Sequence, residues 1–328
     1  MNGIRTISPE LELNMQKPLI VLLPGLFMPV SSWSRETLRN LRQFGDCVTL
    51  SLPGHYPQPA LQEGQHYDKA LVLESIDRQL AEHLEPEQLA SRPVVLFGHS
   101  TGALTALYYA SQRQSIISAV ISIGGTVDGR EEENVYYWNQ LGTRYLGKFG
   151  LLLTNFSTSI GTRYASTHRL VMKAAFHNPD KVLADDDFET AMADYIPDLK
   201  KFDTSTAGRI LRDLYHFDAK AELKRLHRPV WVCAGEEDDF VPERRTRQLV
   251  ETLPDATLDL IPDTGHLPFV EETQRFFRLM RVFMQQAGLA EWAESQPSLS
   301  VKESAGSMAS RDRAALRSRT RKFSASGS

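Results

Sequence analysis

A serine flanked by nearby glycines is the strongest chemical signal in the sequence. The motif GHSTG at residues 98–102 follows the apolar run Val94–Phe97 and precedes the helical pattern Ala103–Ala110. Between a strand and a helix, G-x-S-x-G is typical of a very sharp turn, where side chains in place of the glycines would collide with neighbouring backbone. The turn exposes the hydroxyl at a helix N-terminus, where backbone N–H groups favour negative charge. The motif therefore predicts Ser100 as a nucleophile.

A serine hydroxyl is a poor nucleophile without a general base, and nine histidines are available. His266 lies in the sequence DTGHLP, after the apolar run Ala256–Ile261 and before an amphipathic segment. That order predicts a loop at the carboxyl end of a strand, the same edge as Ser100. We therefore predict His266 as the base rather than as a surface histidine. His55 is a second candidate, for which a structural role in its turn is favoured, and His99 is expected to pack or to line the pocket.

The base also needs an acid that orients it. The sequence GEEDDFVP at residues 235–242 follows the apolar run Val230–Ala234. Four consecutive carboxylates would repel one another if all were functional, so at most one is expected to serve as the acid. The others are ordinary negative charges ahead of a helix.

Short aliphatic runs alternate with longer amphipathic segments along most of the chain. Runs without a polar face are typical of strands covered on both sides in a parallel sheet. The segments Leu71–Leu84 and Glu271–Gln286 repeat apolar residues at helical spacing. The alternation predicts an α/β fold with a doubly wound, mostly parallel sheet. The expected strands are Pro18–Leu23, Val48–Leu52, Val94–Phe97, Ala119–Ile123, Val230–Ala234 and Ala256–Ile261.

Two stretches depart from this alternation. Residues 126–209 contain helical patterns rich in aromatics, which predict a helical insertion. Most of the aromatics are expected to form a small core of its own, and the insertion is a candidate roof for the active site. Residues 297–328 are rich in Ser, Ala and Arg and too poor in apolar residues to offset ordering entropy, so a disordered basic tail is expected. Residues 1–125 and 210–290 are the predicted core.

Composition narrows the classes of partner. Hydrophobic residues make up 41% of the chain, and the formal net charge is −4. This modest charge gives no reason to expect a nucleic-acid partner. The alternative is an adaptor protein that acts through the basic tail. No apolar run reaches the ~18 residues of a transmembrane helix, and Met1–Gln16 has no signal-peptide core. We therefore expect no membrane span and a cytoplasmic location.

The two cysteines, Cys47 and Cys233, are expected to be buried free thiols. The oligomeric state stays open.

Together these motifs resemble the α/β-hydrolase superfamily, in the branch of serine esterases, lipases and lactone- or thioester-cleaving enzymes with a helical cap. The family order of nucleophile, acid and histidine is kept by Ser100, Asp238 and His266. The acid loop of the family often has Gly-x-x-Asp followed by Val-Pro, and this pattern selects Asp238 among the four carboxylates. Asp128 occupies a position that some relatives use for the acid instead.

The resemblance also implies how the substrate is held. Backbone N–H groups of Leu26 and Thr101 would bind the oxyanion in an oxyanion hole. This chain has proline where many relatives have histidine in the His-Gly pair ahead of that loop. Phe27 and Met28 would line the acyl pocket together with His99.

The implied function is cleavage of a carboxylic ester, through an acyl-enzyme, in a small apolar acyl substrate. Thioester, lactone and carbon–carbon hydrolysis use the same three residues and stay open. No metal ion or organic cofactor is required by this chemistry. The alternative from another class is a non-catalytic ligand-binding protein on the same scaffold, because a fold alone does not establish function.

Overall fold

The computed structural model describes residues 17–84, 92–132 and 134–289. Within these ranges six strands form one parallel sheet in the order β2-β1-β3-β4-β5-β6. The predicted α/β fold with a doubly wound sheet is therefore confirmed. The predicted basic tail at residues 297–328 lies outside the described residues. The strands are β1 (Leu19–Leu23), β2 (Asp46–Thr49), β3 (Val94–His99), β4 (Ala119–Ile123), β5 (Val230–Gly235) and β6 (Ala256–Ile261).

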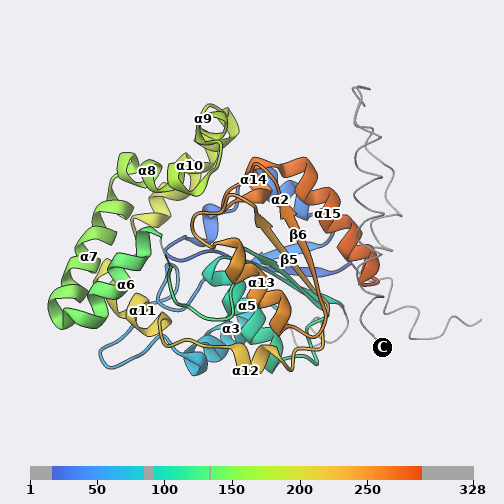
Figure 1. Cartoon of the computed structure of the whole chain (residues 1–328), viewed down its shortest axis with the longest axis horizontal. Coiled ribbons are helices and arrows are strands. Elements are labelled where there is room, and N and C mark those ends of the chain that lie inside the picture. The colour runs from blue at the N-terminus through green and yellow to red at the C-terminus, as the bar shows by residue number, and fades with distance from the viewer. Residues whose placement is uncertain (1–16, 85–91, 133, 290–328) are drawn as a thin grey trace, which may run out of the picture. The chain divides into compact units, whose positions relative to one another are not determined.

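Helices cover both faces of the sheet (Figure 1). One face packs against α2 (Arg35–Leu41) and α15 (Thr273–Gln286). The other packs against α3 (Lys69–His83), α5 (Thr101–Gln112) and α13 (Glu243–Thr252). Because successive side chains of a strand point to opposite faces, a strand between two helical layers must be apolar at every position.

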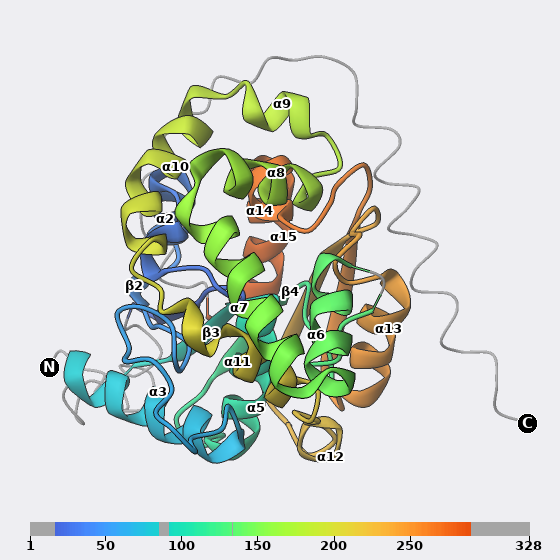
Figure 2. The same cartoon turned by 90° about the vertical axis from the view of Figure 1, so that its left-hand side faces the viewer.

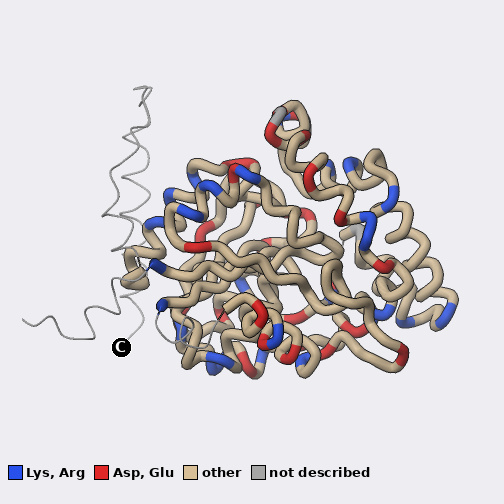
Figure 3. The backbone as a smooth tube through the Cα atoms, turned by 180° about the vertical axis from the view of Figure 1, so that it is seen from behind, with Lys and Arg blue, Asp and Glu red and all other residues tan. Residues whose placement is uncertain are grey.

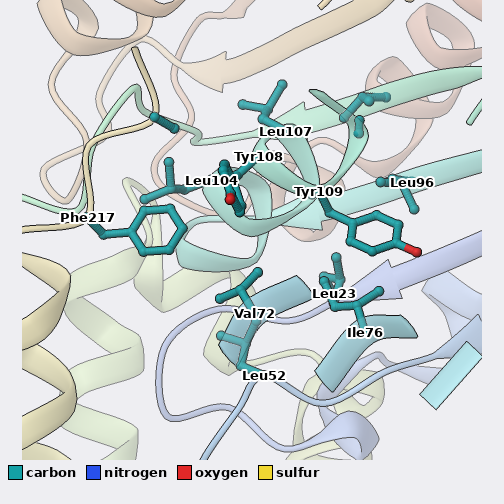
Figure 4. Close-up of a cluster of buried hydrophobic side chains, with 14 of the residues drawn as sticks. Leu23, Leu52, Val72, Ile76, Leu96, Leu104, Leu107, Tyr108, Tyr109 and Phe217 are labelled. Atoms are coloured by element: carbon teal, nitrogen blue, oxygen red, sulfur yellow. The ribbon is translucent and has the colours of Figure 1, made fainter. Parts of the chain in front are cut away.

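Strand β1 illustrates this rule. Leu19, Val21 and Leu23 belong to the cluster on the α3 and α5 side, whereas Ile20 and Leu22 belong to the cluster on the α15 side. Figure 4 shows the first cluster, in which side chains of β1, β3, α3 and α5 lie together. The continuous apolar runs of the sequence thus correspond to strands buried on both faces.

A series of helices connects β4 to β5. It contains α6 (Val135–Tyr145), α7 (Gly147–Arg163), α8 (Ala165–Ala175), α9 (Pro179–Leu183) and α10 (Asp186–Leu199), followed by η2 (Thr204–Thr206), α11 (Ala207–Leu214) and α12 (Lys220–Leu223). Figure 2 shows α6, α7 and α8 on the side of the molecule that faces the viewer. Shorter elements elsewhere are η1 (Val30–Ser32) and α14 (Pro268–Glu271).

Three sequence expectations need correction. Most aromatics of residues 136–176 do not join the small core of the insertion, which is built mainly from α8 to α10, because five of the eight aromatics in this stretch are exposed. These five are Trp138, Tyr145, Phe149, Phe156 and Tyr164. Cys47 is only partly buried, because it lies on the edge strand β2, whereas Cys233 on a central strand is fully buried. Strand β2 also begins and ends earlier than expected.

None of the helices within the described ranges combines the length and apolar character that crossing a membrane requires.

Candidate active site

Ser100 occupies a strained turn between β3 and α5. Its φ of 55° and ψ of −122° lie in a region that residues other than glycine rarely adopt, at a cost of roughly 1–3 kcal/mol. Ser100 N–H donates to the carbonyl of Ile123 at 2.8 Å, which fixes the turn to the end of β4. The turn is so tight that a Cβ on Gly98 would lie 2.5 Å from Cα of Ala103, and one on Gly102 would collide with the carbonyl of Leu23.

The imidazole of His266 is paired with one carboxylate of the acidic loop. Nδ1 of His266 lies 2.8 Å from Oδ2 of Asp238, and both side chains are buried. Oδ1 of Asp238 accepts the backbone N–H groups of Phe240 and Val241 at 2.8 and 2.9 Å. The other three carboxylates of the loop, Glu236, Glu237 and Asp239, are exposed. Only one acid of the four is therefore positioned to orient the histidine.

Asp128, the alternative acid, is engaged elsewhere. Its Oδ1 forms an ion pair with the buried guanidinium of Arg245 at 2.5 Å, and its backbone carbonyl accepts from the same guanidinium. His55, the alternative base, is buried with Nδ1 donating to the carbonyl of Pro53, and its ring stacks on Phe27. Burial lowers the pKa of His55 to about 4. Both alternatives therefore have structural partners of their own.

Aromatic rings hold His266 on two sides. The ring of Phe240 stacks on it with centroids 5.0 Å apart, and the ring of His99 lies 4.6 Å away. His99 Nε2 donates to the carbonyl of His266 at 3.1 Å. Burial, with the nearby His266, holds the pKa of His99 well below its usual value. His99 is thus a neutral side chain that supports the loop of His266.

A cavity of about 320 Å³ joins these groups. Ser100 and His266 both line it, whereas Asp238 lies behind His266 and does not. Both side chains line the cavity, although no hydrogen bond between the Ser100 hydroxyl and His266 is formed among the described residues. The other predicted site residues that line the cavity are Leu26, Phe27, Met28, His99 and Thr101.

The sheet explains why the loop after β1 reaches the serine. Strands β1 and β3 are neighbours, with Leu23 opposite Gly98. The chain leaves β1 at this level, and its next residues turn back through a hydrogen bond from Met28 N–H to the carbonyl of Gly25. Phe27 adopts a φ of 59° in this turn, which is unusual for a bulky residue. Parallel strands that end at one edge thus bring residues 24–28 to Ser100.

Glu271 is a structural residue of the site that sequence reasoning missed. Its Oε1 accepts from Gly265 N–H at 2.7 Å, and its Oε2 accepts from the N–H groups of His177 and Asn178. His266 N–H in turn donates to the carbonyl of Ala175 at the end of α8. One carboxylate therefore ties the loop of His266 to the α8–α9 junction. An acidic residue five positions after the histidine is too common a pattern to have identified it.

Two further polar groups line the cavity and were also missed. Glu131 accepts a hydrogen bond from Asn134 at 2.6 Å, and Asn134 also donates to the carbonyl of Phe240. Burial raises the pKa of Glu131. His168 Nε2 lies 2.7 Å from the hydroxyl of Tyr195, and burial lowers the pKa of His168 to about 4. The remaining wall is largely apolar.

Comparison with known proteins agrees with the fold. The sequence profile of the alpha/beta hydrolase family matches residues 20–279, so this chain belongs to the alpha/beta hydrolase family, as the sequence resemblance predicted. This membership makes the chain a hydrolase-type enzyme.

Individual relatives are more distant. RutD of Stutzerimonas stutzeri (strain A1501), which bears the name of a carbamate hydrolase, is 25% identical over 266 residues, or 80% of this chain and 90% of that protein. RutD of Pseudomonas syringae pv. syringae (strain B728a) is 37% identical over 82 residues, and this match spans 25% of this chain and only 32% of that relative. The solved structure of the esterase RhEst1 from Rhodococcus sp. ECU1013 has a TM-score of 0.61 at 19% identity, covering 84% of this chain and 92% of that one. At such identity the likeness concerns the fold alone.

Proposed function

We propose that this protein is a serine hydrolase that cleaves a carboxylic ester through an acyl-enzyme. Ser100 is the nucleophile, His266 the general base and Asp238 the acid that orients the base. The observation that carries the proposal is the 2.8 Å contact of Asp238 with His266 Nδ1. This contact leaves Nε2 as the nitrogen that can take the proton of the serine, and both residues line the same cavity. This division of roles matches the chemistry of a serine–histidine–acid triad.

The reaction proceeds in two halves. The Ser100 hydroxyl attacks the ester carbonyl and its proton passes to Nε2 of His266, forming a tetrahedral oxyanion. Collapse of this intermediate breaks the bond to the alkoxy group, which leaves as the alcohol with the proton from His266. Water then attacks the acyl-enzyme, His266 takes its proton, and the serine leaves with that proton as the acid is released.

The proposed oxyanion hole consists of two backbone N–H groups, those of Leu26 and Thr101. Leu26 follows the end of β1 and Thr101 is the first residue of α5, and both line the cavity. Neither N–H is taken up by a hydrogen bond to another described residue, so both are available to a developing negative charge. Loss of one such donor typically costs ~10²–10³ in rate.

The substrate proposal follows from the cavity walls. Phe27 and Met28 line the cavity beside the serine, and an apolar cluster of the connecting helices, which includes Met172 and Phe188, forms the other wall. Such walls favour a small apolar acyl group. We accordingly propose that residues 126–209 act as a cap over a core formed by residues 1–125 and 210–290.

Carbamate hydrolysis is the second candidate. A carbamate offers the same carbonyl to Ser100 and adds nitrogen-bound hydrogens. The carboxylate of Glu131, which lines the cavity, can accept a hydrogen bond from such an N–H group. The names of the RutD relatives support this alternative. Thioesters, lactones and carbon–carbon bonds would be cleaved by the same three residues.

Two measurements test the proposal. A fluorophosphonate probe should label wild-type protein at Ser100 and leave the Ser100→Ala variant unlabelled, and the variant should lose hydrolysis of a short p-nitrophenyl ester while its circular dichroism is unchanged. Wild-type activity in Ser100→Ala would overturn the proposal, and a folded wild-type protein that neither reacts nor turns over would favour a binding protein. The rates of hydrolysis of esters and carbamates of matched acyl size then decide which bond the enzyme cleaves. Glu131→Gln is expected to reduce the turnover of carbamates and not that of esters.

A further inference from the structure

The helices between β4 and β5 expose a large apolar surface. Of the ten exposed large hydrophobic side chains among the described residues, nine lie on α6, α7, α8 and the turns between them. We call this surface the outer face. Figures 1 and 2 show that these helices lie on the side of the insertion that faces away from the sheet. Its residues are Trp138, Tyr145, Leu146, Phe149, Leu152, Leu153, Phe156, Tyr164 and Leu170.

Helix α7 has its polarity reversed relative to a helix that packs on a core. Phe149, Leu152 and Phe156 follow helical spacing on one stripe and are 64–66% exposed. Threonines on the other side, Thr154 and Thr158 among them, are buried. A helix normally buries its apolar stripe and exposes its polar one. The exposed stripe is therefore a surface without a partner in the described part of this chain, and isolated surface residues do not explain it.

The charged residues of the segment from Asn134 to Asn178 are all positive. Between Asn134 and Asn178 the sequence has five Lys or Arg residues and no Asp or Glu, although the whole chain carries a net charge of −4. Figure 3 marks the positions of both signs along the backbone. Arg169 and Lys173 form ion pairs with Glu189 and Asp180. The other three cations, Arg144, Lys148 and Arg163, are exposed and take part in no ion pair with a described residue.

We propose that the outer face binds the surface of an anionic phospholipid bilayer. Exposed Phe and Leu side chains on a helix flanked by cations are the composition of helices that lie in the plane of a membrane interface. Trp and Tyr side chains, which have an apolar body and a polar end, prefer the same depth. The cations Lys148 and Arg163 stand near the two ends of α7 and would meet lipid phosphates.

A second copy of the chain is a poorer occupant of the same surface. In a two-fold dimer the same patch meets itself, so Lys148 and Arg163 would face the same cations of the other copy. Like charges opposed across an interface cost binding energy. An anionic lipid surface removes this conflict, because it supplies charge of the opposite sign.

A bilayer at this face would not occupy the cavity. Thr158 and Thr162 of α7 line the cavity, whereas the exposed stripe lies on the opposite side of the helix. The bilayer and the cavity would thus contact opposite sides of α7. The proposal does not depend on the reaction proposed above, because lipid binding is measured without turnover.

Vesicle co-sedimentation of the full-length protein tests the proposal. Wild-type protein should sediment with vesicles of phosphatidylcholine containing one-third phosphatidylserine, and added salt should weaken this binding by screening. The variant Lys148→Gln/Arg163→Gln should bind about thirtyfold more weakly, because each cation near an anionic surface contributes about a fivefold increase in affinity. The variant Phe149→Ser/Leu152→Ser/Phe156→Ser should lose the binding.

Matched controls separate this face from general effects. Lys220→Gln/Lys224→Gln removes two exposed cations, one at the start of α12 and one just after its end, and Val282→Ser removes an exposed apolar residue from α15. Both controls should bind as wild type. All variants should keep wild-type circular dichroism.

Three results would overturn the proposal. The first is absence of wild-type binding to the anionic vesicles. The second is unchanged binding of the two outer-face variants, with loss only when the tail residues Arg317, Arg319 and Arg321 are replaced by Ala. The third is a wild-type dimer in analytical ultracentrifugation that the apolar variant dissociates, without vesicle binding, which would assign the face to a second copy.

Discussion

Nδ1 of His266 lies 2.8 Å from Oδ2 of Asp238, while the other oxygen of that carboxylate accepts two backbone N–H groups from its own loop. Its own loop therefore holds the carboxylate in place, independently of the imidazole. An anion held in this way keeps the Nδ1 position protonated, so that Nε2 faces the cavity as the acceptor.

Replacing this acid should impair the reaction more than replacing any of its neighbours. Asp238→Asn should lower kcat by ~10⁴ with the fold intact, because the amide favours the wrong imidazole tautomer. Asp239→Asn changes an exposed carboxylate next to it and should leave kcat unchanged. Steady-state kinetics on a p-nitrophenyl ester measure both. If Asp128→Asn instead causes the large loss while Asp238→Asn does not, the assigned acid is wrong.

The carboxylate of Glu271 should affect the rate of the reaction by positioning His266. Glu271→Gln replaces one accepting oxygen with an amide NH2 group, which is a donor and opposes backbone N–H groups now bound at 2.7–3.1 Å. The histidine loop should shift, and displacement of a reacting group by about 1 Å can cost ~10²-fold in rate. We expect kcat to fall with little change in KM. Glu272→Gln, which removes only an exposed ion pair with Lys181, is the matched control. Equal kinetics of the two variants would contradict this role.

The serine turn should not tolerate a methyl group at Gly98. In Gly98→Ala the new Cβ would lie 2.5 Å from Cα of Ala103, so the strand and helix must separate. Overpacking of this kind costs about 1–3 kcal/mol. Gly142→Ala on α6 meets no atom within 4 Å and should stabilise the protein by about 0.5–1 kcal/mol. Urea denaturation measures both changes, and a Gly98→Ala variant as stable as wild type would show that the turn relaxes.

Buried His55 should make the protein less stable in acid. Its pKa of about 4 in the folded state lies below the ordinary value of 6.5, because burial disfavours the charged ring. Between these pH values the unfolded state binds more protons, so the free energy of unfolding decreases as the pH falls from 6.5 to 4. His55 alone accounts for about 3 kcal/mol of this decrease.

The variant His55→Phe isolates that contribution. Its free energy of unfolding, measured by urea denaturation at several pH values, should fall less steeply over the same window. Buried His99 and His168 titrate in both proteins and cancel in the comparison. Parallel curves for wild type and variant would show that His55 is not held neutral by burial.

The sequence by itself determined the features that depend on local rules. Apolar runs without a polar face required strands covered on both sides, and the spacing of Gly98, Ser100 and Gly102 required a turn that only small flanking residues allow. The order of β-strands and helices then required that residues 24–28, Ser100 and His266 meet at one edge of the sheet.

Only the tertiary structure decided which groups contact one another. The family pattern selected Asp238 among four adjacent carboxylates, but only the fold shows that Asp238 contacts His266 while its three neighbours are exposed. Glu271 acquired its role from backbone N–H groups about ninety residues away. The aromatics of α6 and α7 became exposed because those helices turn threonines inward. Burial and hydrogen-bond partners depend on packing between distant segments, so they follow from the fold and not from the pattern within one segment.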